Sequence, residues 1–78
     1  MQISLNTTKS CRVDVAQKTG ISYKTVIVKV DAENKRIVVN THKFSNTTNK
    51  HRGVLTRYFK AQHPDFEVDA QDLGEVSL

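Results

Sequence analysis

The sequence contains one cysteine, one proline, three glycines and no tryptophan among its 78 residues. A single thiol, Cys11, cannot form a disulfide within the chain, which fits a reducing compartment. Three glycines are too few for a glycine-rich phosphate loop. No apolar run is long enough to span a membrane, and the N-terminal stretch lacks the basic start and apolar run of a signal peptide. We therefore expect a cytoplasmic protein that does not enter a membrane.

Residues that carry chemistry are also few and scattered. Cys11, His42, His51 and His63 do not have the spacing of metal ligands. No nucleophile-elbow motif is present, and the carboxylates crowd near the C-terminus, where like charges favour solvation over an acid–base pair. Cys11 alternates with valines, which indicates a small buried hydrophobic residue. We expect no enzymatic activity, no cofactor and no metal site.

Charge is distributed unevenly along the chain. Residues 1–64 hold all twelve Lys and Arg residues and three acids, a net charge of +9. Residues 65–78 hold five acids and no Lys or Arg, a net charge of −5, so the overall +4 conceals the contrast. Such asymmetry is typical of proteins that bind polyanions or mask their own basic surface. We expect one compact domain over residues 1–64, followed by an acidic strand or tail over 65–78.

The segment 46–62 shows the clearest helical period in the chain. Four short polar side chains in a row, residues 45–48, are candidates for the helix N-cap. Leu55 and Phe59 fall on the same apolar arc at about 100° per residue. Pro64 pushes His63 out of the helical region, so the helix should end near Gln62.

The residues before this helix are predicted to form strands. Alternation or valine enrichment marks strands at 11–18, 23–30 and 36–41, and 2–6 allows one more short strand. Thr19-Gly20 indicates the first turn, and residues 31–35 have the length of a hairpin connection. Short turns require antiparallel neighbours. The predicted fold is therefore α+β: a three-stranded antiparallel meander packed against one C-terminal helix, with alternation over 65–69 allowing a fourth, edge strand. The predicted core consists of Val26, Val28, Ile37, Val39, Leu55 and Phe59.

Basic side chains gather on and beside the predicted helix. A helix start offers free N–H groups and a positive dipole end, which favour anions. Lys50, Arg57 and Lys60 fall opposite the apolar arc, either as an ordinary solvated face or as phosphate contacts. The predicted contact residues, for a nucleic acid or a partner protein, are Lys43, Lys50, His51, Arg52, Arg57 and Lys60. His51 falls near the apolar arc, where an edge-of-core role is the alternative.

The segment 23–59 also resembles short uncharacterised bacteriophage proteins. The resemblance rests on a valine-rich hairpin, the polar run FSNTTNKHR at residues 44–52, and the aliphatic-aromatic helix that follows. It implies a small accessory protein that binds and inhibits a host protein, acting in the host cytoplasm. Two functions follow: a non-enzymatic module that contacts nucleic-acid phosphates, or an accessory protein that blocks a host component. In either case we expect a monomer or a weak homodimer.

Overall fold

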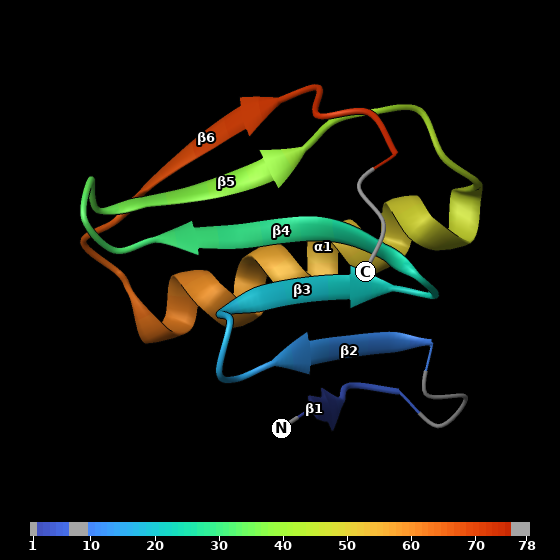
Figure 1. Ribbon diagram of the computed structural model, residues 1–78, viewed down its shortest axis with the longest axis horizontal. Coiled ribbons are helices and arrows are strands. Elements are labelled where there is room, and N and C mark those ends of the chain that lie inside the picture. The colour runs from blue at the N-terminus through green and yellow to red at the C-terminus, as the bar shows by residue number, and fades with distance from the viewer. Residues whose placement is uncertain (1, 7–9, 76–78) are drawn as a thin grey trace.

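The computed structural model describes residues 2–6 and 10–75, which form a six-stranded mixed sheet with one helix on one face (Figure 1). The strands lie in the sheet in chain order, and β1 to β5 pair antiparallel with their neighbours, whereas β6 pairs parallel with β5. The helix forms the crossover between these two parallel strands. The elements are β1 (Gln2–Ser4), β2 (Cys11–Asp14), β3 (Thr19–Ser22), β4 (Thr25–Asp31), β5 (Arg36–Asn40), α1 (Asn46–Gln62) and β6 (Glu67–Gln71).

The predicted three-stranded meander is therefore wrong, although the α+β class holds. The first predicted strand, 11–18, ends at Asp14, and a turn over residues 15–18 follows it. Asp14 Oδ1 accepts a hydrogen bond from Gln17 N, and Lys18 adopts a left-handed φ of 55° that closes this turn. Thr19 and Gly20, predicted as a turn, instead begin β3. The next turn contains Tyr23, also left-handed at φ 56°, so β4 starts two residues later than expected.

Helix α1 has the predicted bounds, and the structure identifies its cap. Ser45 is the N-cap residue, and its Oγ accepts a hydrogen bond from Thr48 N. At the other end, His63 N donates to Phe59 O before Pro64 diverts the chain. The bounds of this helix are predictable because the cap, the apolar arc and the proline all indicate the same start and end.

The core lies between α1 and the sheet. Leu55 and Phe59 pack there against Cys11, Val13, Ile27, Val28, Ile37 and Val39. Gly20 allows close approach of the helix, because a Cβ on this residue would lie 2.9 Å from Leu55 Cδ2. Five of the six predicted core residues are buried; Val26, at the start of β4, is only half-buried.

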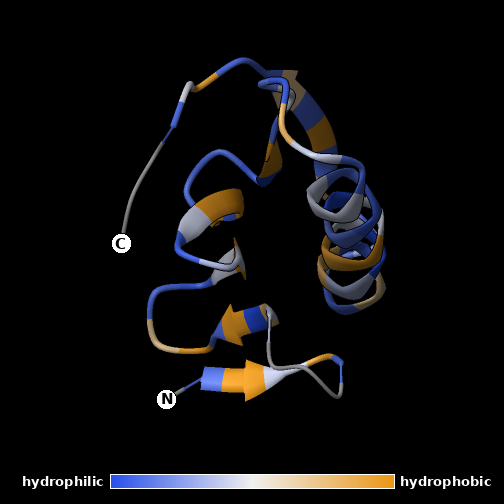
Figure 2. Cartoon of the chain, turned by 90° about the vertical axis from the view of Figure 1, so that its right-hand side faces the viewer, coloured by the Kyte–Doolittle hydropathy of each residue, from blue (hydrophilic) through white to orange (hydrophobic). Residues whose placement is uncertain are grey.

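The C-terminal segment turns to the opposite side of the sheet from α1 (Figure 2). It begins with β6, the strand that the acidic alternation at 65–69 allowed, and continues through Leu73 and Gly74. Asn40, fully buried at the end of β5, holds these two residues by side-chain hydrogen bonds. Residues 72–75, which follow β6, therefore lie on the side of the sheet away from α1 (Figure 2). The last three residues of the predicted tail fall outside the described residues.

Candidate functional site

The structure divides the six predicted contact residues into two groups. The side chains of Lys43, Lys50 and Arg57 are exposed to solvent. Lys50 and Arg57 lie on α1 and flank Gly53, whereas Lys43 lies in the loop that leads into the helix. We call Lys43, Lys50 and Arg57 the basic surface. The remaining three, His51, Arg52 and Lys60, are engaged within the protein.

His51 is buried beneath the helix and cannot contact a partner at the surface. The residue is 8% exposed, and its ring lies 5.8 Å from the ring of Tyr23. Burial lowers the pKa of His51 below its ordinary value, because desolvation disfavours the charged imidazolium. Of the two roles predicted for His51, the position at the edge of the core is therefore the one that the structure shows, and not the contact with a partner.

A Ser–His contact occurs here, but its hydrogen bonds run opposite to those of an activated nucleophile. Ser22 Oγ lies 2.7 Å from His51 Nδ1, and Asn6 Nδ2 lies 3.4 Å from Nε2. Asn6 Oδ1 already accepts from two backbone N–H groups, so Nδ2 faces the ring as a donor. His51 then accepts at Nε2 and donates from Nδ1 to Ser22, whose hydroxyl donates to Thr48 Oγ1. A serine that receives the histidine proton is not deprotonated by it, so this network holds β3 to α1.

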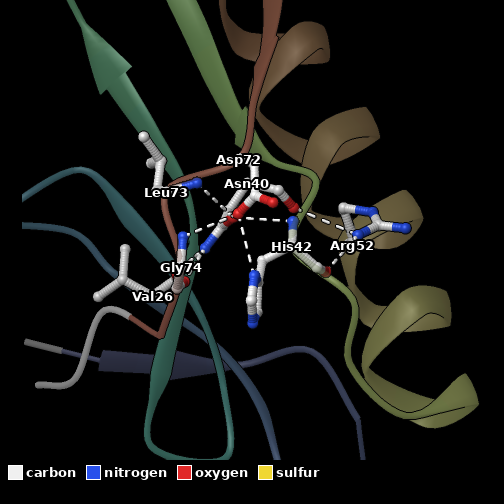
Figure 3. A network of polar contacts seen from close by, with 7 residues as sticks. All are labelled: Val26, Asn40, His42, Arg52, Asp72, Leu73 and Gly74. Carbon is white, nitrogen blue, oxygen red and sulfur yellow. Dashed lines mark hydrogen bonds and ion pairs between the residues drawn. The ribbon is translucent and has the colours of Figure 1, made fainter.

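Arg52 joins the helix to the end of β5 in a polar network (Figure 3). Its Nη1 donates to the carbonyl oxygens of Asn40 and His42 at 3.2 and 3.5 Å. The Asn40 side chain accepts from His42 N and Leu73 N and donates to Gly74 O. The half-buried Arg52 guanidinium is thus a structural tie between α1 and the strand end.

The same network includes a histidine–aspartate contact with the C-terminal segment. His42 Nδ1 lies 3.0 Å from Asp72 Oδ1, which also accepts a hydrogen bond from Gly74 N (Figure 3). The Gly74 N–H and then His42 lower the pKa of Asp72 below its ordinary value. Both contacts favour the carboxylate, which lies mostly exposed beside the strand end.

Lys60 closes the connection between α1 and β6. Its Nζ donates to the carbonyl oxygens of Pro64 and Phe66. The nearby rings of His63 and Phe66 stack at 4.5 Å. Lys60 therefore satisfies backbone groups in a turn, a role that helical periodicity cannot indicate because the acceptors lie beyond the helix.

A groove runs between α1 and the last two strands. It has a volume of about 440 Å³, and its lining combines apolar, polar and basic side chains. The lining residues are Val39, Asn49, Arg52, Gly53, Thr56, Arg57, Val68 and Ala70. The sequence alone does not indicate this groove, because the alternation within β6 does not specify which strand it pairs with. Arg57 belongs to both the groove and the basic surface.

Opposite charges do not neutralise the helix. Residues 46–62 contain four Lys or Arg residues and no acid. Within residues 2–6 and 10–75, the close contacts between basic and acidic side chains join Arg36 to Asp69 and His42 to Asp72, and neither includes α1. The positive charge of the basic surface therefore faces solvent uncompensated.

Among the described residues, no group of three or more His, Cys, Asp or Glu side chains is placed to hold a metal ion. No helix in this part of the chain has the length and apolarity to cross a membrane.

These features define the class of protein: a small α+β domain in which one uncompensated basic helix crosses a mixed sheet. The chain belongs to a family of unknown function, DUF8033, whose family model matches residues 3–69. No curated protein and no solved structure gives a significant match. The family match carries no information about a bacteriophage origin.

Proposed function

We propose that this protein is a small binding module that contacts the phosphate backbone of a nucleic acid through its basic surface. The observation that carries the proposal is the uncompensated charge of α1. A merely solvated helix face ordinarily mixes both signs, since pairs of opposite charge four residues apart stabilise an exposed helix. Here four cations occur on seventeen residues without one acid.

The shape of the helix surface suits close approach of an extended polyanion. Lys50 and Arg57 are seven residues apart, which is about 10 Å along the helix axis. Gly53 lies between them on the same side, and a Cβ placed there would meet nothing within 4 Å. The space above Gly53 lets a phosphate backbone lie against the helix between two cations. Contacts of this kind position a nucleic acid without reading its bases.

The alternative function, a protein that binds and blocks a host component, is favoured by a different feature. The groove beside β6 offers apolar surface and an open strand edge, which a phosphate backbone does not require.

Salt dependence tests the proposed function. Labelled single-stranded DNA, single-stranded RNA and duplex DNA of unrelated sequences are titrated with the protein by fluorescence anisotropy. If three phosphates are neutralised on duplex DNA, affinity should fall about 40-fold between about 50 and 200 mM salt. The loss should be similar for unrelated sequences. Absence of binding to all three probes at the lowest salt, by protein with native circular dichroism, would contradict the proposal.

A further inference from the structure

The outer edge of β6 presents unpaired strand backbone. Glu67 N donates to Lys35 O, and Gln71 O accepts from Thr41 N, so these residues bond inward to β5. Peptide groups alternate in direction along a strand. The N–H and C=O groups of Val68 and Ala70 therefore point to the open edge, where the described part of the chain places no neighbouring strand.

Along this edge, the apolar side chains lie on one face of the sheet and the acidic side chains on the other. Val68 pairs with Ile37 and Ala70 with Val39, so both lie on the α1 face and line the groove. Val68 is 48% exposed, whereas its core-facing neighbour Ile37 is fully buried. The groove lining contains two arginines and no acid. Glu67 and Asp69 alternate with these residues and so lie on the opposite face.

A second copy of the chain is a poor occupant of this edge. In an antiparallel pair of β6 strands centred on Asp69, the Asp69 side chains of the two copies would face each other directly. Shifting the centre to Val68 would place Glu67 of one copy opposite Asp69 of the other. Like charges directly opposite each other destabilise a strand pair. The acids thus disfavour self-association in these two registers, as charges on natural edge strands commonly do.

This protection is one-sided, because no acid lies on the groove face. We propose that β6 accepts an extended segment of a partner protein as a seventh strand. Main-chain hydrogen bonds to Val68 and Ala70 supply attachment, and alternate side chains supply specificity. Residues facing α1 are apolar or acidic, to match Val68 and Arg57. Residues on the other face are basic, to match Glu67, whereas Asp69 already pairs with Arg36 at 3.4 Å.

This inference concerns a different surface from the proposed nucleic-acid contact, and the two surfaces share Gly53 and Arg57. A strand added at β6 lies beside the helix rather than across Lys50. Peptide binding at the edge should therefore survive a Lys50→Gln substitution. Phosphate binding should be weakened by the same change.

The test uses a synthetic peptide of about seven residues, long enough to span β6. Lysine occupies alternate positions, and valine and glutamate share the others. The matched control peptide has the same side chains but N-methylated amides on the edge that would pair with β6. Binding is followed by amide chemical shifts in the full-length protein. We expect a dissociation constant of about 1 mM or lower for the first peptide. The largest shift changes should be at the amides of Val68 and Ala70. The methylated peptide should bind with at least tenfold lower affinity.

A pair of valine substitutions supplies the protein control. Val68→Glu places an acid in the groove and should weaken binding at least tenfold. Val15→Glu changes a valine of similar exposure, 46%, in the turn after β2, a strand far from β6 in strand order, and should leave binding unchanged. Equal affinity for the methylated peptide, or no binding of either peptide at about 1 mM, would overturn the inference. It would also fail if an oligonucleotide displaced the peptide and shifted the same Val68 and Ala70 amides, because the groove would then serve the nucleic acid.

Discussion

His51 of α1 and Ser22 of β3 are joined by a buried contact of 2.7 Å between Nδ1 and Oγ. The contact links the helix to the middle of the sheet. It also removes from the surface a histidine that the sequence had marked as a candidate contact residue. A polar network of this kind is stabilising only while each member keeps its partner.

The first prediction is that His51 makes stability depend on pH. Its pKa is lower in the folded protein than the ordinary 6.5, because the buried ring is desolvated. Above pH 6.5 the ring is neutral in both states, and the network contributes fully. As pH falls below 6.5 the unfolded chain binds a proton that the folded chain resists, so the free energy of unfolding decreases. Urea unfolding at several pH values measures the decrease, and NMR titration of the ring carbon protons measures the pKa. A His51 pKa at or above 6.5 would contradict the account.

The second prediction concerns the C-terminal segment. Asn40→Ala removes the acceptor for Leu73 N and the donor to Gly74 O, leaving partly buried backbone groups without these partners. The loss should cost about 1–3 kcal/mol of unfolding free energy. Hydrogen exchange at the Leu73 amide should accelerate as the segment separates from the sheet. Asn34→Ala, in the exposed turn before β5, is the control and should leave Leu73 exchange unchanged. Unaltered exchange in the Asn40 variant would show that other contacts hold this segment.

The third prediction is that Lys60 contributes to stability, whereas Lys50, on the same helix, does not. Lys60→Ala leaves the carbonyl oxygens of Pro64 and Phe66 without their donor and should cost about 1 kcal/mol. Lys50→Ala, at an exposed position, should change stability by less than about 0.5 kcal/mol. Chemical denaturation of the two variants under the same conditions makes the comparison. Equal stabilities would mean that Lys60 is as freely solvated as Lys50.

Much of the helix, but less of the sheet, could be predicted from the sequence. The signals that define helix α1 are local: its cap, its apolar arc and the proline after it all lie within the helix or next to it in the sequence. The turn at Lys18 and the turn at Tyr23 depend on left-handed backbone at residues that rarely adopt it, so local composition points to Gly20 instead. The pairing of β6 with β5 depends on the helix returning the chain to the same sheet edge. Alternation within β6 cannot specify that partner.

The candidate site shows the same division between local and long-range information. Helical periodicity placed Lys50 and Arg57 on an exposed face correctly, because that face depends only on the helix itself. It could not show that Arg52 and Lys60 donate to carbonyl oxygens of neighbouring segments. The groove requires two elements whose relative position only the tertiary structure gives.

The most direct test of the basic surface compares two double variants that each remove two positive charges. Lys50→Gln with Arg57→Gln changes the basic surface. Lys29→Gln with Lys35→Gln changes the face away from α1 and the β4–β5 turn, so net charge falls equally. Both are titrated with the same labelled duplex at several salt concentrations, after circular dichroism has shown native helix content. The account predicts that the α1 variant loses affinity and about two units of salt slope, whereas the control keeps most of both. Equal loss in the two variants would show that net charge, and not the surface of α1, binds the nucleic acid.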